Sequence, residues 1–111
     1  MNWIRVTRAE NIPLREGRSV RIGDDEIAIF NLGDDRYVAV DNACPHRGGP
    51  LCDGIVSGDA VVYPLHGWKI SLETGNVMKP DVCVRVETYP VSVRDGVVCL
   101  QIENTEEEKA A

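Results

Sequence analysis

Short runs of alternating apolar and polar residues fill most of the chain, and turn residues separate one run from the next. β-branched residues are frequent in these runs, and signals for helices are nearly absent. A period of two residues indicates β-strands with one buried face, and Gly or Asp between two runs indicates a hairpin. The pattern predicts an all-β fold with strands at residues 3–7, 19–22, 26–31, 36–40, 60–63, 69–72, 85–93 and 97–102.

Three of these runs lie close together in the first half of the chain, at residues 19–22, 26–31 and 36–40. Gly-Asp-Asp triplets at residues 23–25 and 33–35 separate them. Because connections this short join antiparallel neighbours, we expect the three strands to form a meander.

Residues 42–58 interrupt the strand pattern. This segment is rich in Pro and Gly and does not fit a regular strand. Long, ordered loops of this composition usually serve a function. Two further loops are expected at residues 64–68 and 78–83.

The composition is that of one soluble domain. The chain has 111 residues, of which 43% are hydrophobic and 27% charged, and its formal net charge is −6. Nucleic-acid binders need clustered Lys and Arg, so the acidic balance argues against that class. An acidic surface suits docking to a basic patch of a protein partner, and it also keeps a small protein soluble.

Neither a targeting signal nor a membrane-spanning run is visible in the sequence. We therefore expect a cytoplasmic protein that does not bind membranes, with a domain at residues 1–103 and an acidic, flexible tail at residues 104–111. In a cytosolic chain, four cysteines indicate metal binding or buried thiols. Cys99 lies in an apolar run and is predicted to be a core residue.

Both histidines of the chain lie in the two special loops. Cys44 and His46 are two residues apart in the first loop, and His66 follows Tyr63 by three residues in the second. A Cys and a His at this spacing can both turn toward one site. Two such loops facing each other would form a four-ligand pocket for a metal.

These loops resemble the two cluster loops of Rieske proteins, whose pattern is C-x-H, fifteen to seventeen residues, and C-x-x-H. The matching stretches are CPHRGGPL at residues 44–51 and PLHGWKI at residues 64–70. With residues 54–58 and 68–72, they are most similar to the small subunit of assimilatory NAD(P)H nitrite reductase. The resemblance implies a Rieske-type domain of stacked antiparallel sheets with two cluster-binding loops.

The resemblance also implies a [2Fe–2S] cluster and its ligands. Cys44 would bind the inner iron, and His46 and His66 would bind the outer iron, which raises the reduction potential above that of an all-Cys cluster. Three glycines in the loops would let backbone N–H groups approach the sulfides. They are Gly48, Gly49 and Gly67.

Position 63 departs from the family pattern, because Tyr63 stands where the family has the second Cys. Tyrosinate can bind ferric iron, but its oxygen lies further from the backbone than a cysteine sulfur does. Cys52 and Cys83 are alternative sources of the fourth ligand. Three outcomes stay open: a [2Fe–2S] cluster with an unusual fourth ligand, a docking or structural subunit without a cluster, and a mononuclear Zn²⁺ or Fe²⁺ site.

The function implied by the resemblance is electron transfer within a nitrite reductase whose large subunit holds flavin and sirohaem. The chain has no nucleotide-binding glycine motif and no evident acid–base pair, so the reaction would need that large subunit. The alternatives are a soluble Rieske ferredoxin of a ring-hydroxylating dioxygenase, with another redox protein as its partner, and a docking subunit that carries no cluster.

Overall fold

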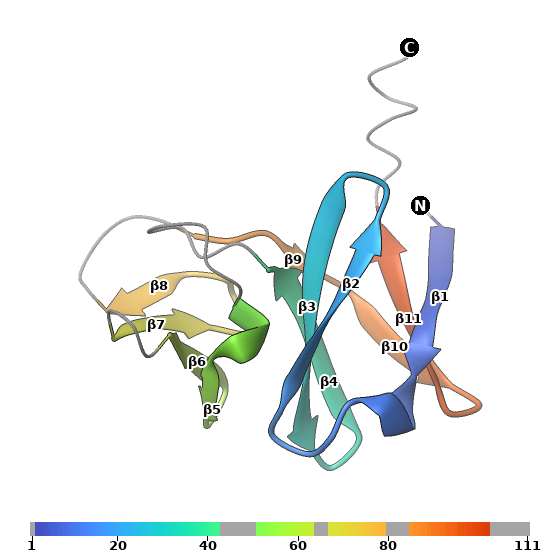
Figure 1. The fold of residues 1–111 in the computed structure, drawn as a ribbon, viewed down its shortest axis with the longest axis horizontal. Coiled ribbons are helices and arrows are strands. Elements are labelled where there is room, and N and C mark those ends of the chain that lie inside the picture. Colours follow the sequence, from blue (N-terminus) through green and yellow to red (C-terminus); the bar gives the residue numbers. More distant parts are fainter. Residues whose placement is uncertain (1, 43–50, 64–66, 80–84, 103–111) are drawn as a thin grey trace.

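The computed structural model of the protein describes residues 2–42, 51–63, 67–79 and 85–102 (Figure 1). Within them the chain forms eleven strands and two 3-10 turns. The strands are β1 (Asn2–Arg8), β2 (Gly17–Ile22), β3 (Asp25–Gly33), β4 (Arg36–Asp41), β5 (Ile55–Ser57), β6 (Ala60–Tyr63), β7 (Trp68–Ser71), β8 (Val77–Lys79), β9 (Thr88–Tyr89), β10 (Val91–Arg94) and β11 (Val97–Ile102). The turns are η1 (Ala9–Asn11) and η2 (Leu51–Asp53).

The strands form three antiparallel sheets. Their orders are β1-β11-β10, β2-β3-β4-β9 and β5-β6-β7-β8. Figure 1 shows the β5–β8 sheet to one side of the other two. The all-β fold expected from the sequence is confirmed, and the expected meander is β2-β3-β4.

The expected single strand at residues 85–93 is wrong, because the chain changes sheets within it. β9 pairs with β4, whereas β10 pairs with β11, and Pro90 lies between them. Proline has no N–H to donate to a sheet. The Pro90 carbonyl nevertheless accepts a hydrogen bond from the Gln101 N–H at 3.1 Å. This bond holds the connection between β9 and β10 against β11.

Two strands lie where the sequence predicts loops. β5 falls within the expected loop at residues 42–58, and β8 overlaps the expected loop at residues 78–83 in its last two residues, so both loop predictions are wrong at these positions. Each strand has three residues, which is too short for an alternating pattern to be visible. Pairing with β6 and β7, which are longer, supplies their hydrogen bonds.

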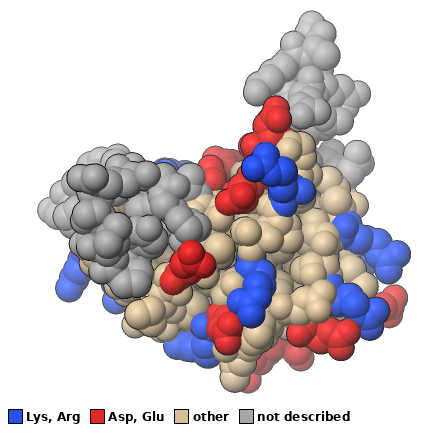
Figure 2. All heavy atoms as spheres, viewed as in Figure 1, with Lys and Arg blue, Asp and Glu red and all other residues tan. Residues whose placement is uncertain are grey.

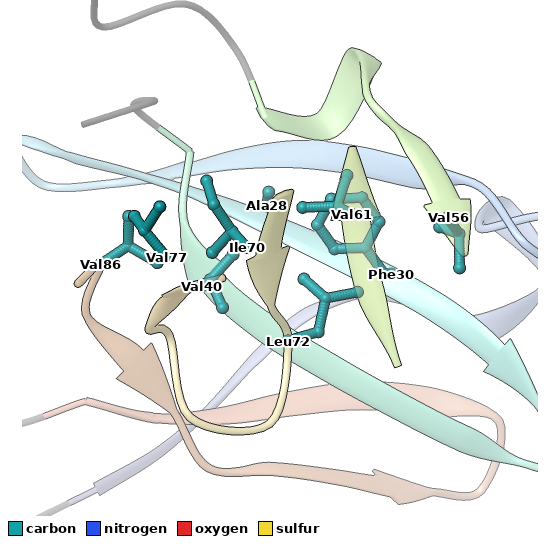
Figure 3. Packing of buried hydrophobic residues seen from close by; sticks show 9 residues of the cluster. All are labelled: Ala28, Phe30, Val40, Val56, Val61, Ile70, Leu72, Val77 and Val86. Carbon is teal, nitrogen blue, oxygen red and sulfur yellow. The ribbon is translucent and has the colours of Figure 1, made fainter. Parts of the chain in front are cut away.

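Charged side chains lie on the outside of the molecule (Figure 2), and apolar side chains form two clusters inside it. β3 lies between the clusters and is buried on both faces. Ala28 and Phe30 face one cluster, and Ile27 and Ile29 face the other. The first cluster joins the β5–β8 sheet to β3 and β4 (Figure 3) and contains Ala28, Phe30, Val40, Val56, Val61, Ile70, Leu72, Val77 and Val86.

The second cluster lies between the β2-β3-β4-β9 sheet and the β1-β11-β10 sheet. It contains Ile12, Ile27, Ile29, Ala39, Val98 and Leu100. Cys99 is also buried, as expected, and its thiol lies 3.8 Å from the Val97 carbonyl oxygen. In the part of the chain that the structure describes, no helix is long and apolar enough to cross a membrane.

Candidate functional site

The second predicted loop leaves the β5–β8 sheet at the end of a hairpin. Tyr63 is the last residue of β6, and its Cα is paired with that of Trp68 in β7. The next residue of β7, Lys69, is paired with Lys79, the last residue of β8. The segments at residues 64–66 and 80–84 therefore leave the sheet at the same end.

Asn42 connects the two ends of the first predicted loop. Its side chain is buried, and its Oδ1 accepts a hydrogen bond of 2.9 Å from the backbone N–H of Cys52. Its Nδ2 donates to Oε1 of Glu26 at 2.6 Å, and its backbone N–H donates to the Glu26 carbonyl at 2.9 Å. Because an amide side chain both donates and accepts, Asn42 holds the start and the end of this loop against β3.

Gly75 anchors the chain where it returns after residues 80–84. The Val86 N–H donates to the Gly75 carbonyl at 2.7 Å, and a Cβ at Gly75 would lie 2.2 Å from the Val86 carbonyl oxygen. The φ of Gly75 is +81°, in the left-handed region that favours glycine. An isolated bridge between Asn76 and Arg85 continues the contact.

Arg36 links the β5–β8 sheet to β4. Its guanidinium donates to Asp59 at 2.8 Å and to Glu73 at 2.5 Å, in the turns after β5 and β7. The hydrogen bond to Glu73 and the charge of Asp59 raise the pKa of Arg36. All three side chains are about half exposed, so the pairs position the sheet more than they stabilise the fold.

Most of the predicted ligands lie outside the described residues. They are Cys44, His46 and His66, together with Cys83 and two of the three loop glycines, Gly48 and Gly49. For Tyr63 the structure describes the backbone position at the hairpin end. Gly67 has a φ of +66°, and among the described residues beyond its chain neighbours no atom lies within 4 Å of the place a Cβ would take. Its role beside a cofactor stays a prediction.

Cys52 is partly buried beside Asp53, with its Sγ 3.9 Å from the Asp53 Oδ1. Burial, and then the charge of Asp53, raise the pKa of the Cys52 thiol. Since the thiolate is the form that binds metals, these surroundings do not favour Cys52 as a ligand. The described parts of the chain contain no group of three or more His, Cys, Asp or Glu side chains that could hold a metal ion.

The sequence pattern did not indicate Asn42 or Arg36 as anchors. For Gly75 there was a usable signal, because it is a glycine between the expected strand at residues 69–72 and the expected loop at residues 78–83. The partners of Asn42 and Arg36 lie between 10 and 37 residues away along the chain. Such distant contacts have no local signature.

Together these features define a small antiparallel domain whose separate four-stranded sheet carries loops at one end. Residues 2–101 match the model of the Rieske-like [2Fe-2S] domain, and the chain belongs to this family. It is therefore a Rieske-type electron-transfer domain.

Several proteins are similar to the chain over nearly its whole length. The 3-phenylpropionate/cinnamic acid dioxygenase ferredoxin subunit of Shigella flexneri is 32% identical over 104 residues, which cover 92% of this chain and 95% of that protein. The structure of a Sphingomonas yanoikuyae B1 ferredoxin is 27% identical, with a TM-score of 0.82, and the match covers 92% of this chain and 100% of that one.

A third similar protein is assigned as the small subunit of an NADH-dependent nitrite reductase from Mycobacterium tuberculosis. Its structure is 25% identical, with a TM-score of 0.81, and the match covers 92% of this chain and 96% of that one. The similar proteins thus include both a nitrite reductase small subunit and ferredoxins.

The family implies a [2Fe–2S] cluster, and the donor set of this chain matches it in part. By the family pattern, His46 and His66 would supply the two imidazoles for one iron, and Cys44 would supply one thiolate for the other. Tyr63 stands at the family position of the second Cys, and burial, followed by the charge of Asp53, raises the pKa of the Cys52 thiol. Cys83 lies outside the described residues. The donor set at the family positions therefore fits a [2Fe–2S] cluster at three of its four ligands.

Proposed function

We propose that the protein is the electron-transfer small subunit of an NAD(P)H-dependent nitrite reductase, carrying or descended from a Rieske [2Fe–2S] centre. One observation carries this proposal. The C-x-H and x-x-H motifs of the sequence fall in two segments whose flanking residues are held by the Asn42–Cys52 hydrogen bond and by the Tyr63–Trp68 pair. Similarity to the Mycobacterium tuberculosis protein supports the choice of nitrite reductase.

In this proposal the larger partner carries out the chemistry on nitrite, with flavin and sirohaem as its own cofactors. The present chain contributes a folded surface and the loop ligands Cys44, His46 and His66. The Arg36 pairs and the first apolar cluster fix the β5–β8 sheet against β3 and β4. A rigid scaffold of this kind keeps loop ligands at constant distances, which metal binding requires.

Position 63 divides the proposal into three forms. In the first, a [2Fe–2S] cluster uses an unusual fourth ligand, with Tyr63 as the residue at the family position. In the second, the subunit carries no cluster and acts by docking. A mononuclear metal held by Cys44, His46 and His66 is a third possibility, since this set leaves an open position.

A second candidate function is that of a soluble Rieske ferredoxin in a ring-hydroxylating dioxygenase system. The 32% identity to the Shigella flexneri ferredoxin subunit specifically favours it. This candidate differs from the first in the partner that takes part in electron transfer. A binding experiment with both kinds of partner therefore separates the two.

The first test is metal analysis of anaerobically purified protein, with visible and EPR spectra. A coloured protein with iron, sulfide and a rhombic EPR signal of low average g after reduction supports the cluster-bearing form. A colourless protein that still binds the large subunit supports the docking form.

The second test measures nitrite-dependent NAD(P)H oxidation by a nitrite reductase large subunit with and without this chain. We expect the chain to bind the large subunit and to raise the rate. Binding to a dioxygenase oxygenase component, with none to the nitrite reductase, would replace the first candidate by the second.

A further inference from the structure

One row of four residues crosses the outer face of the β5–β8 sheet. The Cα pairs Ile55–Val62, Val62–Lys69 and Lys69–Lys79 place these residues side by side on successive strands. Residues paired across antiparallel strands point to the same face of a sheet. The adjacent row is buried in the first apolar cluster and consists of Val56, Val61, Ile70 and Val77. The row that ends in Lys79 therefore faces away from the core.

Lys69 and Lys79 bring two positive charges onto neighbouring strands, beside the register shift between Lys69 and Ile70. Like charges in this position destabilise a sheet, and no ion pair to either Lys is found among the described residues. The chain as a whole is acidic, with 18 Asp and Glu against 12 Lys and Arg. Nothing within the described fold compensates this pair, so a carboxylate from outside would relieve its repulsion.

Charge is separated along the β5–β8 sheet. The acidic residues Asp59 and Glu73 lie in the turns at one end, where Arg36 binds both. Lys69 and Lys79 lie toward the other end, where the segments 64–66 and 80–84 leave the sheet. Figure 2 shows Lys and Arg side chains at the left edge of the molecule, on the side where Figure 1 places β7 and β8.

Exposed apolar residues accompany the lysines. Ile55, in the same row, is 61% exposed, and Met78, next to Lys79, is 52% exposed. Protein interfaces have an apolar centre and a polar rim, so Ile55 and Met78 fit the centre of an interface and the two lysines its rim. A nucleic acid would need many more cations than this face carries, in a chain of net charge −6.

We propose that Lys69 and Lys79 form a carboxylate-binding pair that docks an acidic patch of a partner protein onto the outer face of the β5–β8 sheet. Identifying this partner with a reductase large subunit rests on the proposed function. The docked face adjoins the end of the sheet that carries the second and third loops. This interface is opposite in charge to the one that the acidic composition suggests.

The test compares binding to a nitrite reductase large subunit for the wild type and for the double variant K69E/K79E. Reversing both charges places them against the partner's carboxylates, and we expect affinity at low salt to fall at least about tenfold. The affinity of the wild type falls with added salt, and that of the double variant falls less steeply. The conservative variant K69R/K79R keeps its affinity, and so does the control R5E, which changes an exposed cation on β1.

A probe that does not depend on the partner's identity is the peptide hexaglutamate, followed by ¹⁵N NMR on the full chain. We expect salt-sensitive shifts at Lys69 and Lys79, and none in K69E/K79E, whose circular dichroism matches the wild type. Shifts centred on Arg5 and Arg8 instead would overturn the proposal. Shifts that appear only after Glu106, Glu107 and Glu108 are replaced by Gln would also overturn it, because the chain's own tail would then occupy the pair.

The two experiments distinguish a failure of the proposed function from a failure of the lysine pair. No binding of the wild type to the nitrite reductase large subunit counts against the proposed function, and the hexaglutamate titration then decides the lysine pair alone. Equal affinity of the wild type and K69E/K79E for the large subunit counts against the docking pair and leaves the proposed function standing.

Discussion

The backbone N–H of Cys52 donates a 2.9 Å hydrogen bond to the side-chain oxygen of Asn42, ten residues earlier in the chain. Asn42 is only 2% exposed, and its amide nitrogen donates to Glu26 on β3. One buried side chain therefore closes the first predicted cluster loop and connects it to the central sheet. Asn42 thus both positions this loop and supplies the acceptor for the backbone N–H of Cys52.

Replacing Asn42 with Ala is expected to lower the free energy of unfolding by about 1–3 kcal/mol, because the backbone N–H of the partly buried Cys52 loses its acceptor. Urea unfolding of both proteins measures the change. The control is Asn11→Ala, which removes an exposed hydrogen bond to Thr7 and is expected to cost no more than about 0.5 kcal/mol. Equal losses in the two variants would contradict the structural role of Asn42.

Gly75 and Gly96 form a matched pair for a second prediction. Both have positive φ, +81° and +74°, but a Cβ at Gly75 would lie 2.2 Å from the Val86 carbonyl oxygen. A Cβ at Gly96 would have no atom of the described residues within 4 Å beyond its chain neighbours. Gly96→Ala is expected to cost about 1 kcal/mol, from backbone conformation alone. Gly75→Ala adds a steric clash with backbone and is expected to cost more than about 3 kcal/mol.

Thermal and urea unfolding of the two glycine variants give these values. Gly75→Ala is also expected to increase proteolysis within residues 80–84, because the Val86–Gly75 hydrogen bond holds the chain that follows this segment. If both variants lose the same free energy, the close approach of Gly75 and Val86 is not a constraint on the fold.

Alternation along the chain was enough to predict the meander, because β2, β3 and β4 are long and joined by short turns. It also placed Ile27 and Phe30 in a strand. That β3 is buried on both faces, with alternate residues in two different clusters, depends on the packing of two other sheets. The break at Pro90 had a local signal in the proline itself, but the exchange of partners from β4 to β11 had none.

The ligand residues of the site could be predicted from the sequence, whereas the contacts around them could not. The spacing of Cys44, His46 and His66 is a property of the sequence, so the family could be inferred from it. The contacts that hold the loop ends join residues far apart in the chain. Arg36 meets Asp59 and Glu73 only after the β5–β8 sheet has packed against β4. Contacts of this kind follow from tertiary structure rather than from local pattern.

Tyr89 is expected to make stability depend on pH in the alkaline range. Burial, and then the charges of Asp25, Asp41 and Glu87, raise the pKa of Tyr89 from its ordinary value of 10.0 to about 12. The folded protein therefore holds the phenol proton more tightly than the unfolded chain. The resulting stability is complete below about pH 10 and is lost as the pH rises through about 12.

A pKa raised this far sets an upper bound of about 2.7 kcal/mol on the free energy of unfolding that is lost when Tyr89 ionises. Because the side chain is partly exposed, we expect a loss of about 1 kcal/mol. Urea unfolding at pH 9, 10.5 and 12 should show this loss in the wild type, and Tyr89→Phe should lack it. Titration of the lysines is common to both proteins and cancels in the comparison. Parallel pH profiles of the two proteins would refute the assignment.

The last prediction concerns position 63, where the backbone lies at the end of the β6–β7 hairpin. The family pattern has Cys there, so Tyr63→Cys restores the second thiolate for the inner iron. We expect the variant, purified anaerobically, to contain about two iron atoms per chain, as a [2Fe–2S] centre requires. Its visible and EPR spectra should be stronger than those of the wild type.

The control for Tyr63→Cys is Tyr37→Cys, which adds a thiol on β4 and should not raise the iron content. If Tyr63→Cys gains a cluster that the wild type lacks, the missing thiolate explains the loss, because ligand number decides metal binding. If the wild type already holds two irons with the same spectra, another residue supplies the fourth ligand. If neither protein binds iron, the loops have lost more than one ligand, and docking alone remains for this subunit.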